Sequence, residues 1–90
     1  MLTVSITISG KVQGVWYRQS AKEQAQQLGI TGQVRNEPDG SVHIIATGTK
    51  EKMDQFINWC KKGPPKARVT NIDFKELPLQ QFTHFTIERF

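Results

Sequence analysis

The sequence predicts an α+β fold of the ferredoxin-like sandwich type, with two helices on one face of a mainly antiparallel sheet. Short segments in which apolar residues alternate with polar ones indicate half-buried strands. Two segments with apolar residues at helical spacing indicate amphipathic helices. Their order is strand, helix, strand, strand, helix, strand, with a short C-terminal strand added (βαββαβ plus one). We expect a single domain over residues 1–90, a length within the range of one small domain.

The first strand is predicted at residues 2–9. Its apolar residues, Val4, Ile6 and Ile8, alternate with threonine and serine. This period of two places the apolar side chains on one face of the sheet and presents the hydroxyl side chains outward on the other. A loop bracketed by glycines, at residues 10–14, follows the strand.

The first helix is predicted at about residues 17–28, where Ala21 and Ala25 recur at helical spacing among glutamine, lysine and glutamate. Gly29 followed by apolar Ile30 is typical of a helix that ends in a Schellman motif, with the glycine in the left-handed region. The helix is therefore expected to stop at this glycine.

A hairpin is predicted next. The second strand covers about residues 32–35 and runs into residues 37–40, whose proline and glycine suit a tight turn. The third strand follows at residues 42–46, where apolar residues again alternate with others.

The second helix is predicted to begin after Thr49, which can cap it, and to end at residues 63–65, Gly-Pro-Pro. Its apolar face consists of Met53, Phe56, Ile57 and Cys60. The fourth and fifth strands are marked by apolar pairs at residues 72–74 and 85–87.

The composition excludes several classes of protein. A net charge of +4 and a pI near 9.5 attract anions of any kind, but many cytosolic proteins carry such a charge without an anionic partner. We see no secretory signal and no apolar stretch long enough to span a membrane. Cys60 is the only cysteine, and with two histidines it cannot build a zinc site of the usual ligand count. We expect a cytoplasmic protein without metal or cofactor.

The predicted topology brings two segments together. A strand–helix–strand unit makes its two strands parallel, joined by a right-handed crossover. The end of the first strand at Gly10 and the end of the second at Asn36 then lie at the same edge of the sheet. The loop at residues 10–17 becomes a neighbour of Asn36, and we expect the functional site there.

This loop has the features of an anion-binding turn. Glycines allow a ligand to approach the backbone, successive N–H groups can form a nest, and the following helix adds its unpaired N–H groups and dipole. No serine, threonine, aspartate or asparagine stands ahead of Arg18 in the loop to cap the helix, so a bound phosphate would act as the missing cap. The alternative is that Gly14 is an ordinary N-cap and water satisfies the remaining groups.

Two side chains accompany the loop. Arg18 falls in the first helical turn, where a cation opposes the helix dipole, and a guanidinium there would complement phosphate oxygens. The alternative is a solvated surface arginine. Asn36 precedes a turn, a position that asparagine also favours because its side chain bonds to nearby backbone. Its place beside the loop is what favours a role in the site.

The remaining reactive or aromatic side chains have structural interpretations. We expect His43 and His84 to be surface or partly buried residues without a catalytic role, and Cys60 to be a buried small hydrophobe. Trp16 and Tyr17 either wall the loop or anchor the helix, with packing favoured for Tyr17.

At these residues the chain resembles the acylphosphatase family. Residues 10–18, GKVQGVWYR, match that family's motif G-x-V-Q-G-V-x-[FY]-R. Residues 32–36, followed by residues 39–42 and Gly48, are similar to its second motif, and residues 63–69 to a third segment. The three segments occur in the right order and cover nearly the whole chain.

The resemblance implies the fold reached above and an activity, hydrolysis of acyl phosphates to a carboxylate and inorganic phosphate. It implies that Arg18 binds the substrate and that Asn36 orients the attacking water. The backbone that would hold the phosphate belongs to Gln13, Gly14, Val15, Trp16 and Tyr17. One departure is Gln33, where the family usually places an aromatic residue, and it affects neither site residue.

The implied chemistry is consistent with these residues. A carboxylate leaving group, whose conjugate acid has a pKa of about 4, needs no protonation, and a loose phosphoryl-transfer transition state needs little activation of water. Positioning and charge stabilisation suffice. We therefore expect a monomer that acts on small acyl phosphates without a metal, a nucleic acid or a membrane. The alternatives are an RNA-binding module with the same element order and a phosphate-binding domain without turnover.

Overall fold

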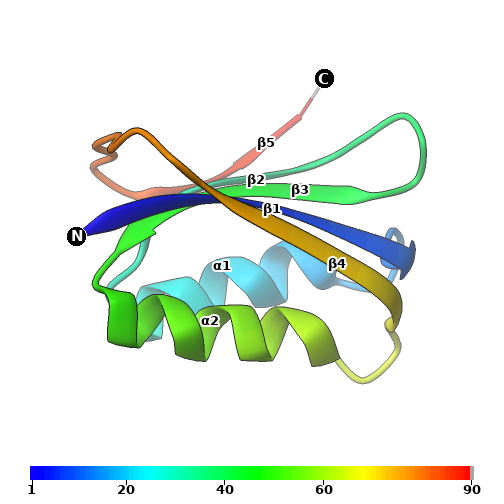
Figure 1. Ribbon diagram of the computed structural model, residues 1–90. Helices are drawn as coiled ribbons and strands as arrows, with labels where there is room; N and C mark the ends of the chain where they lie inside the picture. The colour runs from blue at the N-terminus through cyan, green and yellow to red at the C-terminus, as the bar shows by residue number, and fades with distance from the viewer. Residues whose placement is uncertain (90) are drawn as a thin grey trace.

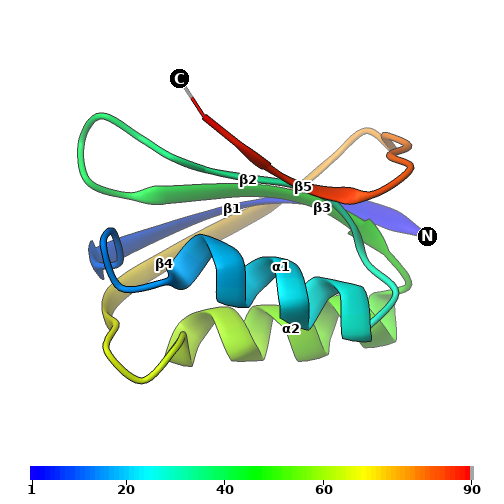
Figure 2. The ribbon, with the colours of Figure 1, turned by 180° about the vertical axis from the view of Figure 1, so that it is seen from behind.

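A computed structural model, which describes residues 1–89, has the predicted order of elements (Figure 1). These are β1 (Leu2–Lys11), α1 (Tyr17–Gln27), β2 (Thr31–Asn36), β3 (Val42–Gly48), α2 (Lys50–Lys62), β4 (Arg68–Leu77) and β5 (Phe85–Glu88). The strands form one sheet in the order β4-β1-β3-β2-β5. Only β2 and β5 pair in parallel. Both helices cover the same face of the sheet (Figure 1, Figure 2), which confirms the ferredoxin-like sandwich.

The core lies between the sheet and the two helices. Val4, Ile6 and Ile8 of β1 are buried, as the alternation predicts. Ala21 and Ala25 of α1 are also fully buried, and their small side chains let this helix pack closely on the sheet. This packing holds the N-terminus of α1 in a set position relative to the strand ends.

The C-terminus of α1 has the predicted Schellman geometry. Gly29 has φ 70°, in the left-handed region. The Ile30 N–H donates to the Ala25 carbonyl at 2.8 Å, and the Gly29 N–H donates to the Gln26 carbonyl at 3.2 Å. Buried Ile30 then leads directly into β2.

The outward face of β1 differs from the prediction at one end. Thr3 faces away from the helices, yet it is fully buried. Its Oγ1 lies 2.6 Å from Oγ1 of Thr47 and accepts a hydrogen bond of 2.8 Å from the Gln80 N–H. The chain between β4 and β5 covers this end of the sheet, which strand alternation alone does not reveal. Phe74, in turn, is 54% exposed because β4 is an edge strand.

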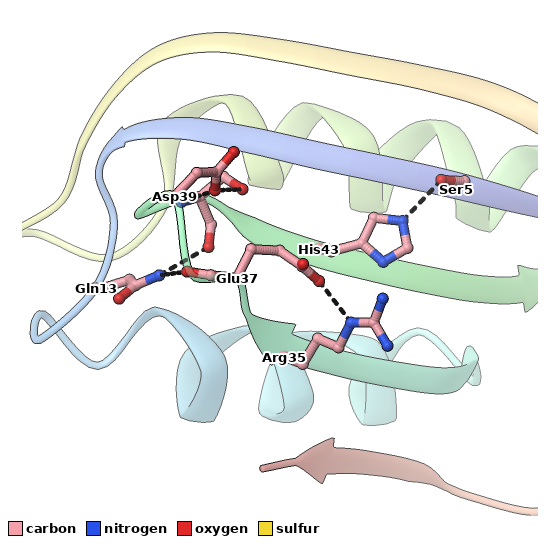
Figure 3. A network of polar contacts seen from close by, with 7 residues as sticks. Ser5, Gln13, Arg35, Glu37, Asp39 and His43 are labelled. Atoms are coloured by element: carbon pink, nitrogen blue, oxygen red, sulfur yellow. Dashed lines mark hydrogen bonds and ion pairs between the residues drawn. The ribbon is translucent and has the colours of Figure 1, made fainter. Parts of the chain in front are cut away.

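The histidines and the cysteine lie where structural roles are expected. His43 is half-buried on the face of the sheet away from the helices, with Nε2 2.9 Å from Oγ of Ser5 (Figure 3). Burial lowers the pKa of His43, so its imidazole is neutral near pH 7. Burial raises the pKa of the Cys60 thiol to about 12, which makes it inert as a nucleophile. His84 is exposed.

The strand register aligns the ends of β1 and β2. Ile8 of β1 and Asn36 of β2 both pair with Val42 of β3. Because each strand is antiparallel to β3, the two are parallel to each other and end at the same edge of the sheet. The predicted meeting of the loop after β1 with Asn36 therefore occurs.

Candidate functional site

A cavity of about 320 Å³ lies where α1 begins and where β2 and β5 end. It is lined by Val12, Gly14, Trp16, Tyr17, Arg18, Gln19, Asn36, Ile87 and Arg89. Arg18 and Asn36, predicted from segments eighteen positions apart in the sequence, thus face one space. Most of the backbone residues predicted to hold phosphate line it as well; Gln13 and Val15 do not.

The loop between β1 and α1 turns at two glycines. Gly10 has φ 122°, and a side chain there would collide with the backbone carbonyl of Arg68 in the neighbouring β4. Gly14 has φ 74° and open space around it, so this position needs glycine for its backbone conformation alone. The two glycines let the chain leave the sheet edge and curl toward the cavity.

The side chains of the loop fix its position from two directions. Val12 and Val15 are buried in the core. Gln13 Nε2 donates hydrogen bonds to the backbone carbonyls of Glu37 at 2.8 Å and Ser41 at 2.9 Å (Figure 3). The side chain of Gln13 therefore ties the loop to the turn that follows Asn36, which keeps the two parts of the cavity in register.

The N-terminus of α1 lacks the usual stabilising features. The residue at the N-cap position is Trp16, with φ 66° and ψ 22°, and no side chain caps the helix. The alternative that Gly14 is the N-cap is wrong, because the helix begins two residues later. The first turn carries no acidic residue. The free N–H groups and the positive end of the helix dipole therefore remain available to an anion.

Arg18 extends this positive region. It is half-buried, in the first turn of α1, and within residues 1–89 no carboxylate forms an ion pair with it. By contrast, Arg35 on β2 is engaged by Glu37, with Nε 2.6 Å from Oε1 (Figure 3). Arg18 lines the cavity, and a guanidinium there can bind an anion that enters it.

Asn36 is the last residue of β2 and lines the same cavity as the loop residues. Its side-chain oxygen is buried and has no hydrogen-bond partner within residues 1–89. The alternative that Asn36 stabilises the following turn through this oxygen is therefore wrong. Asp39 does so instead, because its Oδ1 accepts from both the N–H and the hydroxyl of Ser41. A buried polar atom without a partner needs one, and a water molecule in the cavity would supply it.

Sequence reasoning missed the side of the cavity formed by β5. Ile87 pairs with Val34 of β2, and Glu88 pairs with Arg35, so the next residue, Arg89, comes beside the end of β2. It lines the cavity as a second arginine. The alternation of Phe85, Ile87 and Arg89 was visible in the sequence, but the parallel pairing of β5 with β2 was not.

Some features of other sites are missing from the described chain. Within residues 1–89 no three histidine, cysteine, aspartate or glutamate side chains gather as metal ligands. None of the helices there is long and apolar enough to cross a membrane. The central strands β1 and β3 carry no phenylalanine, tyrosine or tryptophan, so they lack the stacking residues of an RNA-binding sheet.

Comparisons with known proteins agree with this geometry. The model of the acylphosphatase family matches residues 4–87. An acylphosphatase of Methylococcus capsulatus is 48% identical over 90 residues, which cover 99% of this chain and 98% of that protein. One from Acaryochloris marina is 46% identical and covers 99% and 96%. The crystal structure of the Bacillus subtilis acylphosphatase superposes with a TM-score of 0.96 at 33% identity, covering 99% of this chain and 100% of that one. On this evidence, the chain belongs to the acylphosphatase family.

Proposed function

We propose that this chain hydrolyses the carboxyl–phosphate bond of acyl phosphates through the cavity at the start of α1. The observation that carries the proposal is that one cavity joins an uncapped helix N-terminus, an arginine and a buried amide oxygen. Within residues 1–89 the arginine has no ion pair and the oxygen has no hydrogen-bond partner. Arg18 supplies the guanidinium and Asn36 the amide. An acyl phosphate with one water molecule would give each of these groups a binding partner.

The phosphoryl group binds at the loop. Backbone N–H groups of residues 13–18 and the Arg18 guanidinium hold its oxygens, with the dipole of α1 adding to the attraction. These donors are already oriented by the packing of the loop, so they need little reorganisation when charge redistributes in the transition state.

Asn36 positions the nucleophile. A water molecule that donates to its side-chain oxygen is held beside the phosphoryl group, in line with the bond to the leaving carboxylate. The water oxygen forms the new bond to phosphorus as the bond from phosphorus to the acyl oxygen breaks. The carboxylate leaves with the bonding electrons. The water proton passes to a phosphoryl oxygen, since none of the described residues that line the cavity is an aspartate, a glutamate or a histidine.

The chemistry explains why so few groups suffice. The departing carboxylate is stable at neutral pH, so neither a general acid nor a metal ion is required. Both key side chains come from one chain, and we propose a monomer as the active form. The cytoplasmic location expected from the sequence stays a prediction.

The test is hydrolysis of benzoyl phosphate in the presence of EDTA, with phenyl phosphate as the comparison. The wild type should hydrolyse benzoyl phosphate and leave phenyl phosphate nearly untouched, because phenolate is a poorer leaving group than benzoate. Asn36→Ala should lower kcat by about 100-fold while the circular dichroism spectrum stays native. Asn71→Ala, which removes an exposed asparagine of β4, is the matched control and should keep full activity.

Three results would contradict the proposal. Loss of activity with EDTA would require a metal ion. Full kcat in Asn36→Ala would remove the assigned role of the amide. Binding of inorganic phosphate with no turnover of benzoyl phosphate would indicate a phosphate-binding domain without catalytic activity.

A further inference from the structure

Trp16 combines three properties that stability does not explain. It is 75% exposed, it lines the cavity, and it has φ 66°. Within residues 1–89 it is the only residue other than glycine with a positive φ. A bulky side chain is disfavoured in this left-handed region, which glycine and asparagine adopt more readily.

The position makes tryptophan still less suitable for stability. As the N-cap of α1, it is where serine, threonine, aspartate or asparagine would accept a hydrogen bond from the first turn. Trp16 accepts none through its side chain. Its indole also takes no part in the aromatic cluster of the described chain, which consists of Tyr17, Phe56, Trp59 and Phe85. Unfavourable backbone geometry at a cavity is often retained for function.

The cavity leaves space beside the phosphoryl group for the acyl group. Its volume of about 320 Å³ is several times the ~30 Å³ share of one water molecule in the liquid. The free N–H groups and Arg18 belong to the start of α1, and the indole of Trp16 beside them is open to solvent. Val12 and Ile87 add apolar lining.

We propose that Trp16 determines acyl-group specificity by stacking on planar aromatic acyl groups. This inference rests on the proposed function and deepens it, since it names aromatic acyl phosphates as the preferred substrate class. The flat face of an exposed indole offers offset stacking to a benzoyl ring and little to an acetyl group.

The experiment compares benzoyl phosphate with acetyl phosphate in the wild type, Trp16→Asn and Trp16→Phe. In Trp16→Asn the ratio of the two kcat/KM values, benzoyl over acetyl, should fall about 5- to 10-fold, the size of one aromatic stacking contact. Trp16→Phe keeps an aromatic face and should retain most of the ratio. Trp16→Asn should also raise Tm by about 4 °C, because asparagine adopts the left-handed region at a lower cost than tryptophan.

A measurement of binding separates this inference from the proposed function. Two non-hydrolysable analogues, 2-oxo-2-phenylethylphosphonate and 2-oxopropylphosphonate, carry the same phenyl and methyl groups. The wild type should bind the phenyl compound more tightly, and Trp16→Asn should lose that preference, even if neither acyl phosphate were turned over. The specificity role would be overturned if Trp16→Asn left the ratio of the two kcat/KM values unchanged. It would also be overturned if the variant lost activity equally with both substrates and affinity equally for both analogues.

Discussion

The two helices of this protein begin in opposite ways. α2 begins after Thr49, whose backbone is extended (φ −70°, ψ 157°) and whose hydroxyl accepts from the Lys52 N–H. Glu51 follows in its first turn, and two lysines stand in its last. α1 begins after Trp16 in the left-handed region, without a side-chain cap, without an acidic residue and with Arg18 in its first turn.

The difference shows that one helix start follows the rules of stability, whereas the other departs from them at the candidate site. A cap and an acidic residue stabilise a helix N-terminus because they satisfy free N–H groups and complement the dipole. The start of α2 follows these rules, and it lines no part of the cavity around Arg18 and Asn36. The start of α1 departs from each of them, and it lies at that cavity. A phosphoryl group would replace both missing features at once.

The contrast between the starts of the two helices is tested most strongly by neutralising the second residue of each helix. Arg18→Gln should lower kcat/KM for benzoyl phosphate by about 1,000-fold, because the charged donor for the phosphoryl oxygens is lost. It should leave the free energy of unfolding unchanged or raise it by about 0.3–1 kcal/mol, since a cation is removed from the positive end of the dipole. Enzyme assays and urea denaturation measure the two effects.

The matched variant on the other helix is Glu51→Gln. It should keep full activity and lower the free energy of unfolding by about 0.3–1 kcal/mol, the opposite sign. If Arg18→Gln lowered the free energy of unfolding enough to account for the lost activity, Arg18 would be a structural residue. The contrast between the two helices would then fail.

A smaller effect is expected at Gln13, which ties the loop before α1 to the turn after β2. Gln13→Ala removes two hydrogen bonds to carbonyls that each keep one backbone partner, so the loss of stability should be about 1 kcal/mol. Activity should fall about 10-fold because the loop and Asn36 lose their fixed spacing. Gln81→Ala, at an exposed position, is the control. Unchanged kcat/KM in Gln13→Ala would show that the core contacts alone hold the loop.

The smallest effect on activity is expected at the cap of α2. Thr49→Ala should lower the free energy of unfolding by about 1 kcal/mol, the usual cost of losing an N-cap. Its kcat/KM for benzoyl phosphate should equal that of the wild type, because the residue is remote from the cavity lining. A fall in activity with stability retained would mean that the start of α2 also serves the site.

Local patterns predicted the elements well where neighbouring residues decide the structure. The stop of α1 at Gly29 depends on two hydrogen bonds within residues 25–30, so the glycine followed by apolar Ile30 was enough to predict it. The start of α1 was harder. Nothing local indicated that Trp16 rather than Gly14 takes the cap position, because tryptophan by its own preference avoids the left-handed region that it adopts here.

The order of elements, the apolar faces and the lack of a cap ahead of Arg18 follow from local patterns, because each depends on residues a few positions apart. The residues that surround the site could be identified only from the tertiary structure. The Gln13 side chain donates to the backbone of the turn after Asn36. Arg89 lies beside the end of β2 because β5 pairs with β2. These contacts join residues far apart in the chain through strand register, and register follows from the packing of the whole sheet rather than from any local segment.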